Sequence, residues 1–132
     1  MEAADTSVLV RYLVQDDPDK GAAAARVLDG GQEVAISLVA IAETAFVLAH
    51  HYAVPRDLIV DRLVELIQKQ NIHLLGIDKA LAASVLLLCR GSTRVSFTDA
   101  LINADARHHG LQRLHTLDER FPAEGLVLVA PA

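Results

Sequence analysis

The sequence contains few of the residues that mark several classes of protein. Among 132 residues there is one cysteine, no tryptophan and only 4% aromatic residues, so the core must be aliphatic and no internal disulfide can form. No apolar run reaches the roughly 18–20 residues that span a bilayer. The N-terminal residues lack the basic and apolar regions of a signal peptide. We therefore expect a cytoplasmic protein that makes no membrane contact.

An excess of basic residues is also missing. Twelve Lys and Arg residues stand against seventeen Asp and Glu residues, which gives a net charge of −5. Nucleic-acid-binding proteins usually carry a basic face, so this balance argues mildly against one. If four of the acids surrounded two divalent cations, the remaining charges would nearly balance. The composition is therefore compatible with a phosphate substrate but does not favour one.

Apolar residues make up 52% of the chain, which is enough to bury a core in one domain over residues 1–132. Hydrophobic periodicity and turn residues predict strands that mostly alternate with helices. The predicted strands are 3–4, 34–37, 72–75, 112–116 and 126–129, and the predicted helices are 8–14, 22–28, 38–52, 55–70, 79–89 and 99–110. This order indicates an α/β fold with a mainly parallel sheet and helices on both faces.

The segment 96–104 is the most informative stretch of the chain. Ser96 and Thr98 precede Asp99, which stands at the start of an apolar helix rich in small residues, and Asn103 lies one turn further along the same face. An acid in such a place either caps the helix or acts on a ligand. Three further acids have comparably apolar surroundings: Asp5, Glu43 and Asp118.

The predicted elements allow these acids to converge. Asp5 and Asp118 each follow a predicted strand, and the carboxyl ends of parallel strands open into one crevice. Glu43 is the only acid inside a long apolar helix, where its neighbours Val39 and Phe46 are apolar, so a buried charge there needs compensation. We therefore expect the four carboxylates to form one site.

Each acid also has an ordinary structural explanation. Asp5 and Asp118 could be turn residues, and Asp99 could close a capping box that Ser96 begins. Glu43 is the hardest of the four to explain in this way. Taken together, crowded carboxylates repel unless they share a cation, and oxygen ligands without cysteine or clustered histidine suit Mg²⁺ or Mn²⁺. Such cations clamp phosphate and lower the pKa of bound water, which predicts phosphodiester hydrolysis.

Four ordered motifs resemble those of PIN-domain ribonucleases, and in particular the VapC-type toxins of bacterial toxin–antitoxin pairs. Each motif is weak alone, but their order and spacing over residues 5–129 are specific. The motifs are Asp5-Thr6-Ser7-Val8-Leu9, Ile36-Ser37 with Glu43, Phe97-Thr98-Asp99-Ala100-Leu101-Ile102, and Thr116-Leu117-Asp118 with Phe121.

The resemblance implies a three-layer α/β/α sandwich and an endoribonuclease toxin that depends on Mg²⁺ or Mn²⁺. It also implies a homodimer, a small antitoxin whose segment covers the active site, and transfer or ribosomal RNA as substrate. The catalytic and metal-binding acids would be Asp5, Glu43, Asp99 and Asp118. The supporting residues would be Thr6, Ser7, Ser96, Asn103 and Thr116.

The chain departs from this pattern in two places. Some relatives carry an acid where this chain has Ser96, and the first strand, which contains Glu2, is less hydrophobic than usual. An alternative is therefore a catalytically weak or inactive PIN-like module that binds protein or RNA. A phosphotransfer or phosphatase domain is a third possibility, but Glu43 would have no role there. Four scattered arginines are interpreted as solvated surface: Arg11, Arg90, Arg107 and Arg113.

Overall fold

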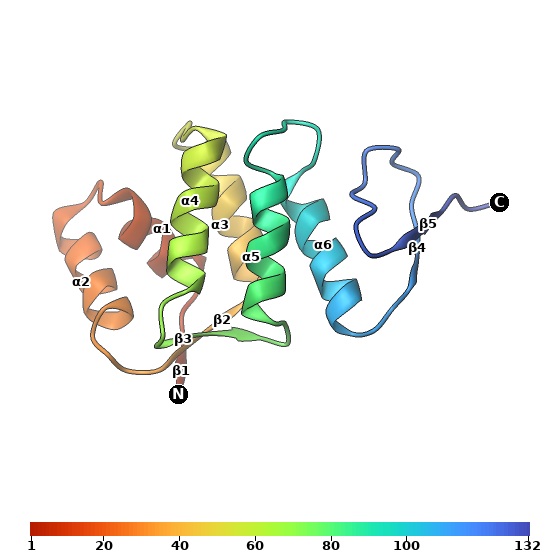
Figure 1. Ribbon diagram of the computed structural model, residues 1–132. Coiled ribbons are helices and arrows are strands. Elements are labelled where there is room, and N and C mark those ends of the chain that lie inside the picture. The colour runs from red at the N-terminus through yellow and green to blue at the C-terminus, as the bar shows by residue number, and fades with distance from the viewer.

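The computed structural model describes all residues from 1 to 132 (Figure 1). Every predicted strand and helix is present, and β2 and β3 have the predicted bounds. The strands are β1 (Glu2–Ala3), β2 (Val34–Ser37), β3 (Ile72–Leu75), β4 (Arg113–His115) and β5 (Val127–Val129). The helices are α1 (Thr6–Val14), α2 (Pro18–Leu28), α3 (Leu38–His50), α4 (Arg56–Ile67), α5 (Lys79–Leu88) and α6 (Phe97–His108).

Short polar side chains begin most of the helices. Asp78 caps α5, and the hydroxyl of Ser96 caps α6 by accepting a hydrogen bond from the Asp99 N–H at 3.0 Å. Asp5, which the sequence allows as a turn residue or a site acid, is the N-cap of α1. Its backbone is still extended where β1 ends (φ −99°, ψ 179°), so its carboxylate reaches the first free N–H groups of the helix.

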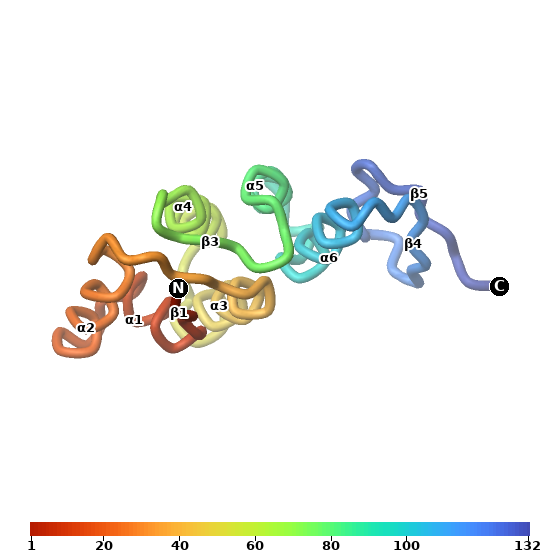
Figure 2. The backbone as a smooth tube through the Cα atoms, turned by 90° about the horizontal axis from the view of Figure 1, so that it is seen from below, coloured from red at the N-terminus to blue at the C-terminus, as the bar shows by residue number.

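All strand pairs are parallel, as predicted, but they form two separate sheets. One sheet has the order β1-β2-β3 and the other contains only β4 and β5. Figure 2 shows α4 and α5 on one side of the first sheet and α1, α2 and α3 on the other. Both views place β4 and β5 beyond α6, at the end of the molecule opposite α2. A single five-stranded sheet is therefore not formed in this chain.

Asn103 explains the position of the second sheet. This side chain is fully buried in α6, and its amide nitrogen donates to the carbonyls of Pro122 at 2.9 Å and Glu124 at 3.0 Å. Phe121 and Leu126 are buried beside these contacts. The segment that joins β4 to β5 is thus fastened to α6, while α6 itself packs against α5 and α3.

The main core is aliphatic, as the composition predicts. Its largest fully buried side chains are leucines and isoleucines from the helices and from β2 and β3. Cys89, the single cysteine, is buried in this core. None of the helices has the length and apolar character that crossing a membrane requires. The core therefore depends on packing of branched side chains rather than on aromatic rings or cross-links.

Replacing Asn103 by alanine should weaken the attachment of the second sheet. The change leaves two carbonyls without their donor in a buried place, which costs about 1–3 kcal/mol of unfolding free energy. Urea unfolding measures this loss, and Gln112→Ala at an exposed position serves as the control. Equal unfolding midpoints for Asn103→Ala and the wild-type chain would contradict the assigned role.

The pair of Asp29 and Lys69 should make stability depend on pH in two directions. Hydrogen bonds from Lys69 (2.8 Å) and from the Tyr12 hydroxyl (2.7 Å) lower the pKa of Asp29, and the hydrogen bond to Asp29 raises the pKa of Lys69. The contribution of Asp29 is present above about pH 4 and is lost as the pH falls through its lowered pKa. The contribution of Lys69 is present below its usual pKa and is lost as the pH rises through its raised pKa. The melting temperature of Asp29→Asn should therefore change less than that of the wild type at both acidic and alkaline pH. Identical plots of melting temperature against pH for the two proteins would refute this.

Candidate functional site

Two of the four predicted acids share a recess at the carboxyl ends of β1 and β2. Asp5 and Glu43 line a hollow of about 450 Å³ together with Thr6 and Ser7. The reason is the topology, because β1 and β2 are neighbours and each leads directly into its helix. Asp5, at the end of a strand, and Glu43, inside a helix, therefore lie in the same recess, as the sequence predicts.

Asp5 is held in its ionised form. Its Oδ1 accepts hydrogen bonds from the Ser7 hydroxyl at 2.6 Å, the Ser7 N–H at 3.0 Å and the Val8 N–H at 3.3 Å. The Ser7 hydroxyl and then the Val8 N–H lower the pKa of Asp5 below its usual value. All three bonds use Oδ1, which leaves Oδ2 free for a ligand. Ser7 therefore supports Asp5 by direct contact.

Glu43 is exposed, which corrects the prediction that it lies buried in an apolar setting. Its neighbours Val39 and Phe46 are also exposed, at 78% and 55%. The prediction failed because no other element packs over this face of α3. The helix buries its opposite face instead, with Ala40, Ile41, Thr44, Ala45 and Leu48.

Asp99 lies in the first turn of α6, outside the recess of Asp5 and Glu43. Half of the predicted capping box is formed, because the Ser96 hydroxyl accepts from the Asp99 N–H. Ser96, Phe97 and Thr98 line a smaller hollow with Phe46 of α3, one turn after Glu43. The start of α6 thus lies against the same helix that carries Glu43.

Asp118 is an exposed turn residue after β4, which is the ordinary explanation considered for it. Its N–H donates to the Thr116 hydroxyl at 3.0 Å, and its Oδ1 accepts from the Arg120 N–H at 2.8 Å. Thr116 therefore shapes the turn that carries Asp118. Since β4 pairs with β5 and not with β1, Asp118 does not reach the recess.

The predicted cluster of four carboxylates is consequently not assembled in the single chain. No group of three or more His, Cys, Asp or Glu side chains is placed to hold a metal ion. Asp5 and Glu43 supply oxygen atoms of the kind that Mg²⁺ and Mn²⁺ prefer. In the single chain the recess therefore supplies two of the four predicted carboxylate ligands.

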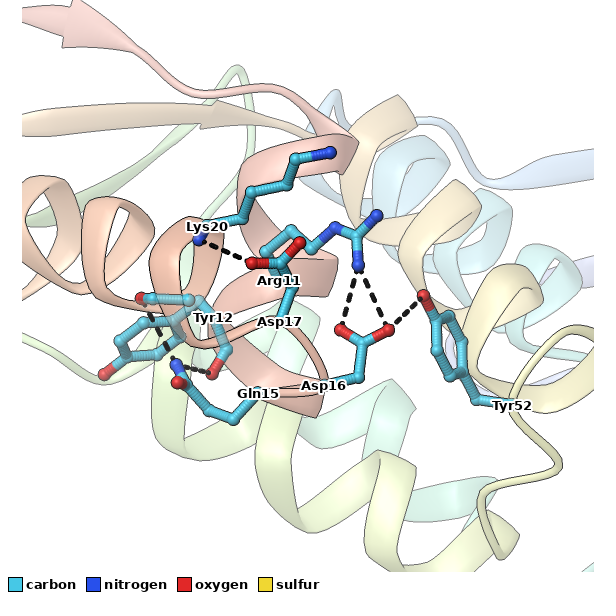
Figure 3. Close-up of polar contacts among 8 residues, drawn as sticks. Arg11, Tyr12, Gln15, Asp16, Asp17, Lys20 and Tyr52 are labelled. Carbon is cyan, nitrogen blue, oxygen red and sulfur yellow. Dashed lines mark hydrogen bonds and ion pairs between the residues drawn. The ribbon is translucent and has the colours of Figure 1, made fainter.

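Arg11 also lines the recess, although the sequence had suggested ordinary solvated surface. Its Nη1 atom lies 3.0 Å from both carboxylate oxygens of Asp16, and the Tyr52 hydroxyl donates to Asp16 at 3.2 Å (Figure 3). Burial alone would raise the pKa of Asp16, but the hydrogen bond and charge of Arg11 lower it. Ser7 and Arg11 are four residues apart on α1 and therefore share a face of the helix, so this spacing in the sequence could have predicted that Arg11 lies beside the acids.

Lys20 adds a second cation close to Arg11. The two side chains line a neighbouring hollow of about 410 Å³, together with Ser7 and Val8. Asp17 caps α2 by accepting from the Lys20 N–H at 3.0 Å, which fixes where this helix begins (Figure 3). The acidic chain therefore carries a local pair of positive side chains beside its two gathered acids.

Comparison with known proteins agrees with the predicted family. The PIN domain family matches residues 3–124. A crystal structure of the Mycobacterium tuberculosis toxin VapC20, described as cleaving the sarcin-ricin loop, matches with 22% identity, over 99% of this chain and 100% of that chain, at a TM-score of 0.45. No curated protein matches the sequence significantly. Because the family match covers nearly the whole length, the chain belongs to the PIN domain family.

Proposed function

We propose that the chain is an endoribonuclease toxin of a toxin–antitoxin system, which hydrolyses RNA phosphodiester bonds with Mg²⁺ or Mn²⁺. The observation that carries the proposal is the recess in which Glu43 and the ionised Asp5 both lie beside the guanidinium of Arg11, which Asp16 holds in place. Membership of the PIN domain family supports the same chemistry. The recess combines groups that bind cations with a group that binds phosphate.

Arg11 is suited to hold the RNA backbone. Asp16 engages only its Nη1 atom, so Nη2 and Nε remain available to donate to a phosphate oxygen. The planar guanidinium matches two oxygen atoms of a phosphate at once, which a lysine ammonium does not. Asp16 and Tyr52 hold Arg11 in place before substrate arrives, so less side-chain freedom is lost on binding.

The carboxylates are proposed as the cation ligands. Asp5 and Glu43 would bind the cation through oxygen, and Asp99 and Asp118 are proposed as the remaining acids of the site. A Mg²⁺ or Mn²⁺ ion held by these acids would supply Lewis acidity and would lower the pKa of a water molecule. Ser7 keeps Asp5 charged, Thr116 shapes the Asp118 turn and Ser96 caps α6, whereas Thr6 lines the recess.

The wider biology is proposed on the same basis. The substrate would be a transfer or ribosomal RNA, the partner a small antitoxin that covers the recess, and the working form a homodimer in the cytoplasm. Asn103 belongs to this proposal as a scaffold residue rather than a ligand, because both hydrogens of its amide are used on the segment between β4 and β5.

One observation favours a second candidate, a PIN-like module that binds RNA or protein with little catalysis. Asp118 lies outside the recess of Asp5 and Glu43 in this chain. A module of this kind would use Arg11 and Lys20 to bind phosphate without cutting it. Binding of RNA without cleavage at any Mg²⁺ or Mn²⁺ concentration would select this candidate over the nuclease.

Asp5→Asn should abolish cleavage of structured RNA while leaving the fold intact. Asparagine still caps α1, but it lacks the negative charge that holds a cation, so the rate should fall at least about 100-fold. The measurement is cleavage of transfer and ribosomal RNA in Mg²⁺ or Mn²⁺, with EDTA stopping the wild-type reaction. Asp29→Asn, which changes an acid outside the recess, is the matched control. Wild-type rates in Asp5→Asn would exclude the proposed site.

Arg11→Lys should raise KM for RNA about tenfold, because the charge is kept but the second donor to phosphate is lost. Arg11→Ala should raise it further. The comparison is steady-state cleavage over a range of RNA concentrations, with Arg26→Ala at an exposed position of α2 as the control. A KM unchanged in Arg11→Ala would show that this side chain does not contact the backbone of the substrate.

A further inference from the structure

β1 has an unpaired edge next to the candidate site. The N–H groups of Glu2 and Ala4 donate to the carbonyls of Glu33 and Ala35, on the side of β2. Because successive residues of a strand point their polar groups to opposite sides, the N–H and C=O of Ala3 face away from β2. No strand pairs there, since β1 is the outer strand of its sheet. Such an edge is a template for another strand.

The second sheet has unpaired edges of its own. β4 and β5 pair only with each other, over three residues each. A two-stranded sheet of this size is marginal without further pairing. Leu117, just after β4, is 87% exposed, and Val127 in β5 is 57% exposed. This sheet therefore presents both hydrogen-bonding groups and apolar side chains to its surroundings.

An apolar hollow lies at the carboxyl ends of β1, β2 and β3. It measures about 390 Å³ and includes Ala3, Ala4 and Ala40 together with Val39 and Leu75. Val39 and Leu75 are 78% and 53% exposed, although both are large apolar side chains. Asp5 borders the same hollow. A strand that pairs in parallel with β1 would therefore end near this hollow and near Asp5, an acid of the candidate site.

The β4 strand of the same chain is held away from this edge. The two hydrogen bonds of Asn103 and the burial of Phe121 and Leu126 fasten the β4–β5 unit to the far side of α6. Figures 1 and 2 both show it at the end of the molecule, beyond α6 and away from β1. A second copy presents the same unit without breaking these contacts. Two copies related by a twofold axis can each offer β4 to the β1 strand of the other.

We propose that β4 of a second copy pairs in parallel with β1, and that Asp118 of that copy completes the recess of Asp5 and Glu43. This inference rests on the proposed function, because it assigns Asp118 to the same catalytic site. Asp5 lies just beyond the end of β1 and Asp118 lies just beyond the end of β4. Parallel pairing brings both strand ends to one edge of the sheet, and therefore both carboxylates. Three of the four predicted acids then meet across two chains.

Mixing two inactive variants tests the origin of Asp118. In a dimer of Asp5→Ala with Asp118→Ala, one site has both changes and the other has neither. Random pairing makes half of the dimers mixed, so about a quarter of wild-type activity should return. Mixing Asp5→Ala with Glu43→Ala is the matched control and should stay inactive, because both acids come from the same chain. No recovery in the first mixture would overturn the proposal, since it would place Asp118 in the site of its own chain.

A second measurement is independent of catalysis. Light scattering after gel filtration should give the mass of a dimer for the wild type. Ala3→Pro removes the N–H that faces the open edge while leaving both hydrogen bonds to the β2 side in place, and it should give a monomer. A monomeric wild type, or a dimer that Ala3→Pro leaves intact, would overturn the proposed pairing.

The two proposals fail in different ways. If the wild type is a dimer that Ala3→Pro dissociates but it cleaves no RNA, the pairing stands and the proposed function fails. If the wild type cleaves RNA as a monomer, the proposed function stands and the composite site fails. If the wild type cleaves RNA as a dimer, recovered cleavage in the first mixture shows that Asp118 acts in the site of the other chain, and its absence shows that Asp118 does not.

Discussion

The buried amide of Asn103 is the interaction on which the arrangement of the molecule depends. Its two hydrogen bonds fix the segment between β4 and β5 to α6, and α6 is in turn packed on α5 and α3. The last strands are thereby placed beyond the helices instead of beside β1. With the last strands held there, the edge of β1 is left unpaired and Asp118 lies apart from Asp5 and Glu43.

The local structure could be predicted from the sequence because its causes are local. Apolar periodicity located the helices, and the cap at Ser96 followed from residue type and position. The approach of Asp5 to Glu43 was predictable because adjacent parallel strands lead into their helices at one edge. The partition into two sheets was not, because periodicity shows that a strand has a buried side but does not show which strand pairs with it. The exposure of Glu43 was missed for the same reason.

The net charge of the chain is a poor guide to its candidate substrate. The chain carries −5 overall, yet Arg11 and Lys20 lie together beside the gathered acids. At physiological ionic strength charges are screened beyond about 8 Å, so a phosphate at the recess responds mainly to the nearest groups. Arg11 owes its position to Asp16 and Tyr52, which come from different parts of the chain. Its scattered appearance in the sequence therefore concealed the fixed position of its guanidinium.

A composite site also resolves an energetic difficulty of carboxylate clusters. Several ionised acids in one recess repel one another unless a cation is shared, so a chain that folded around all of them would be destabilised whenever the cation was absent. In the proposed dimer the single chain folds with only Asp5 and Glu43 in the recess. The repulsion arises only when Asp118 of the second copy arrives, and the pairing of β4 with β1 is then available to offset it. Folding and assembly of the site are thereby separate events.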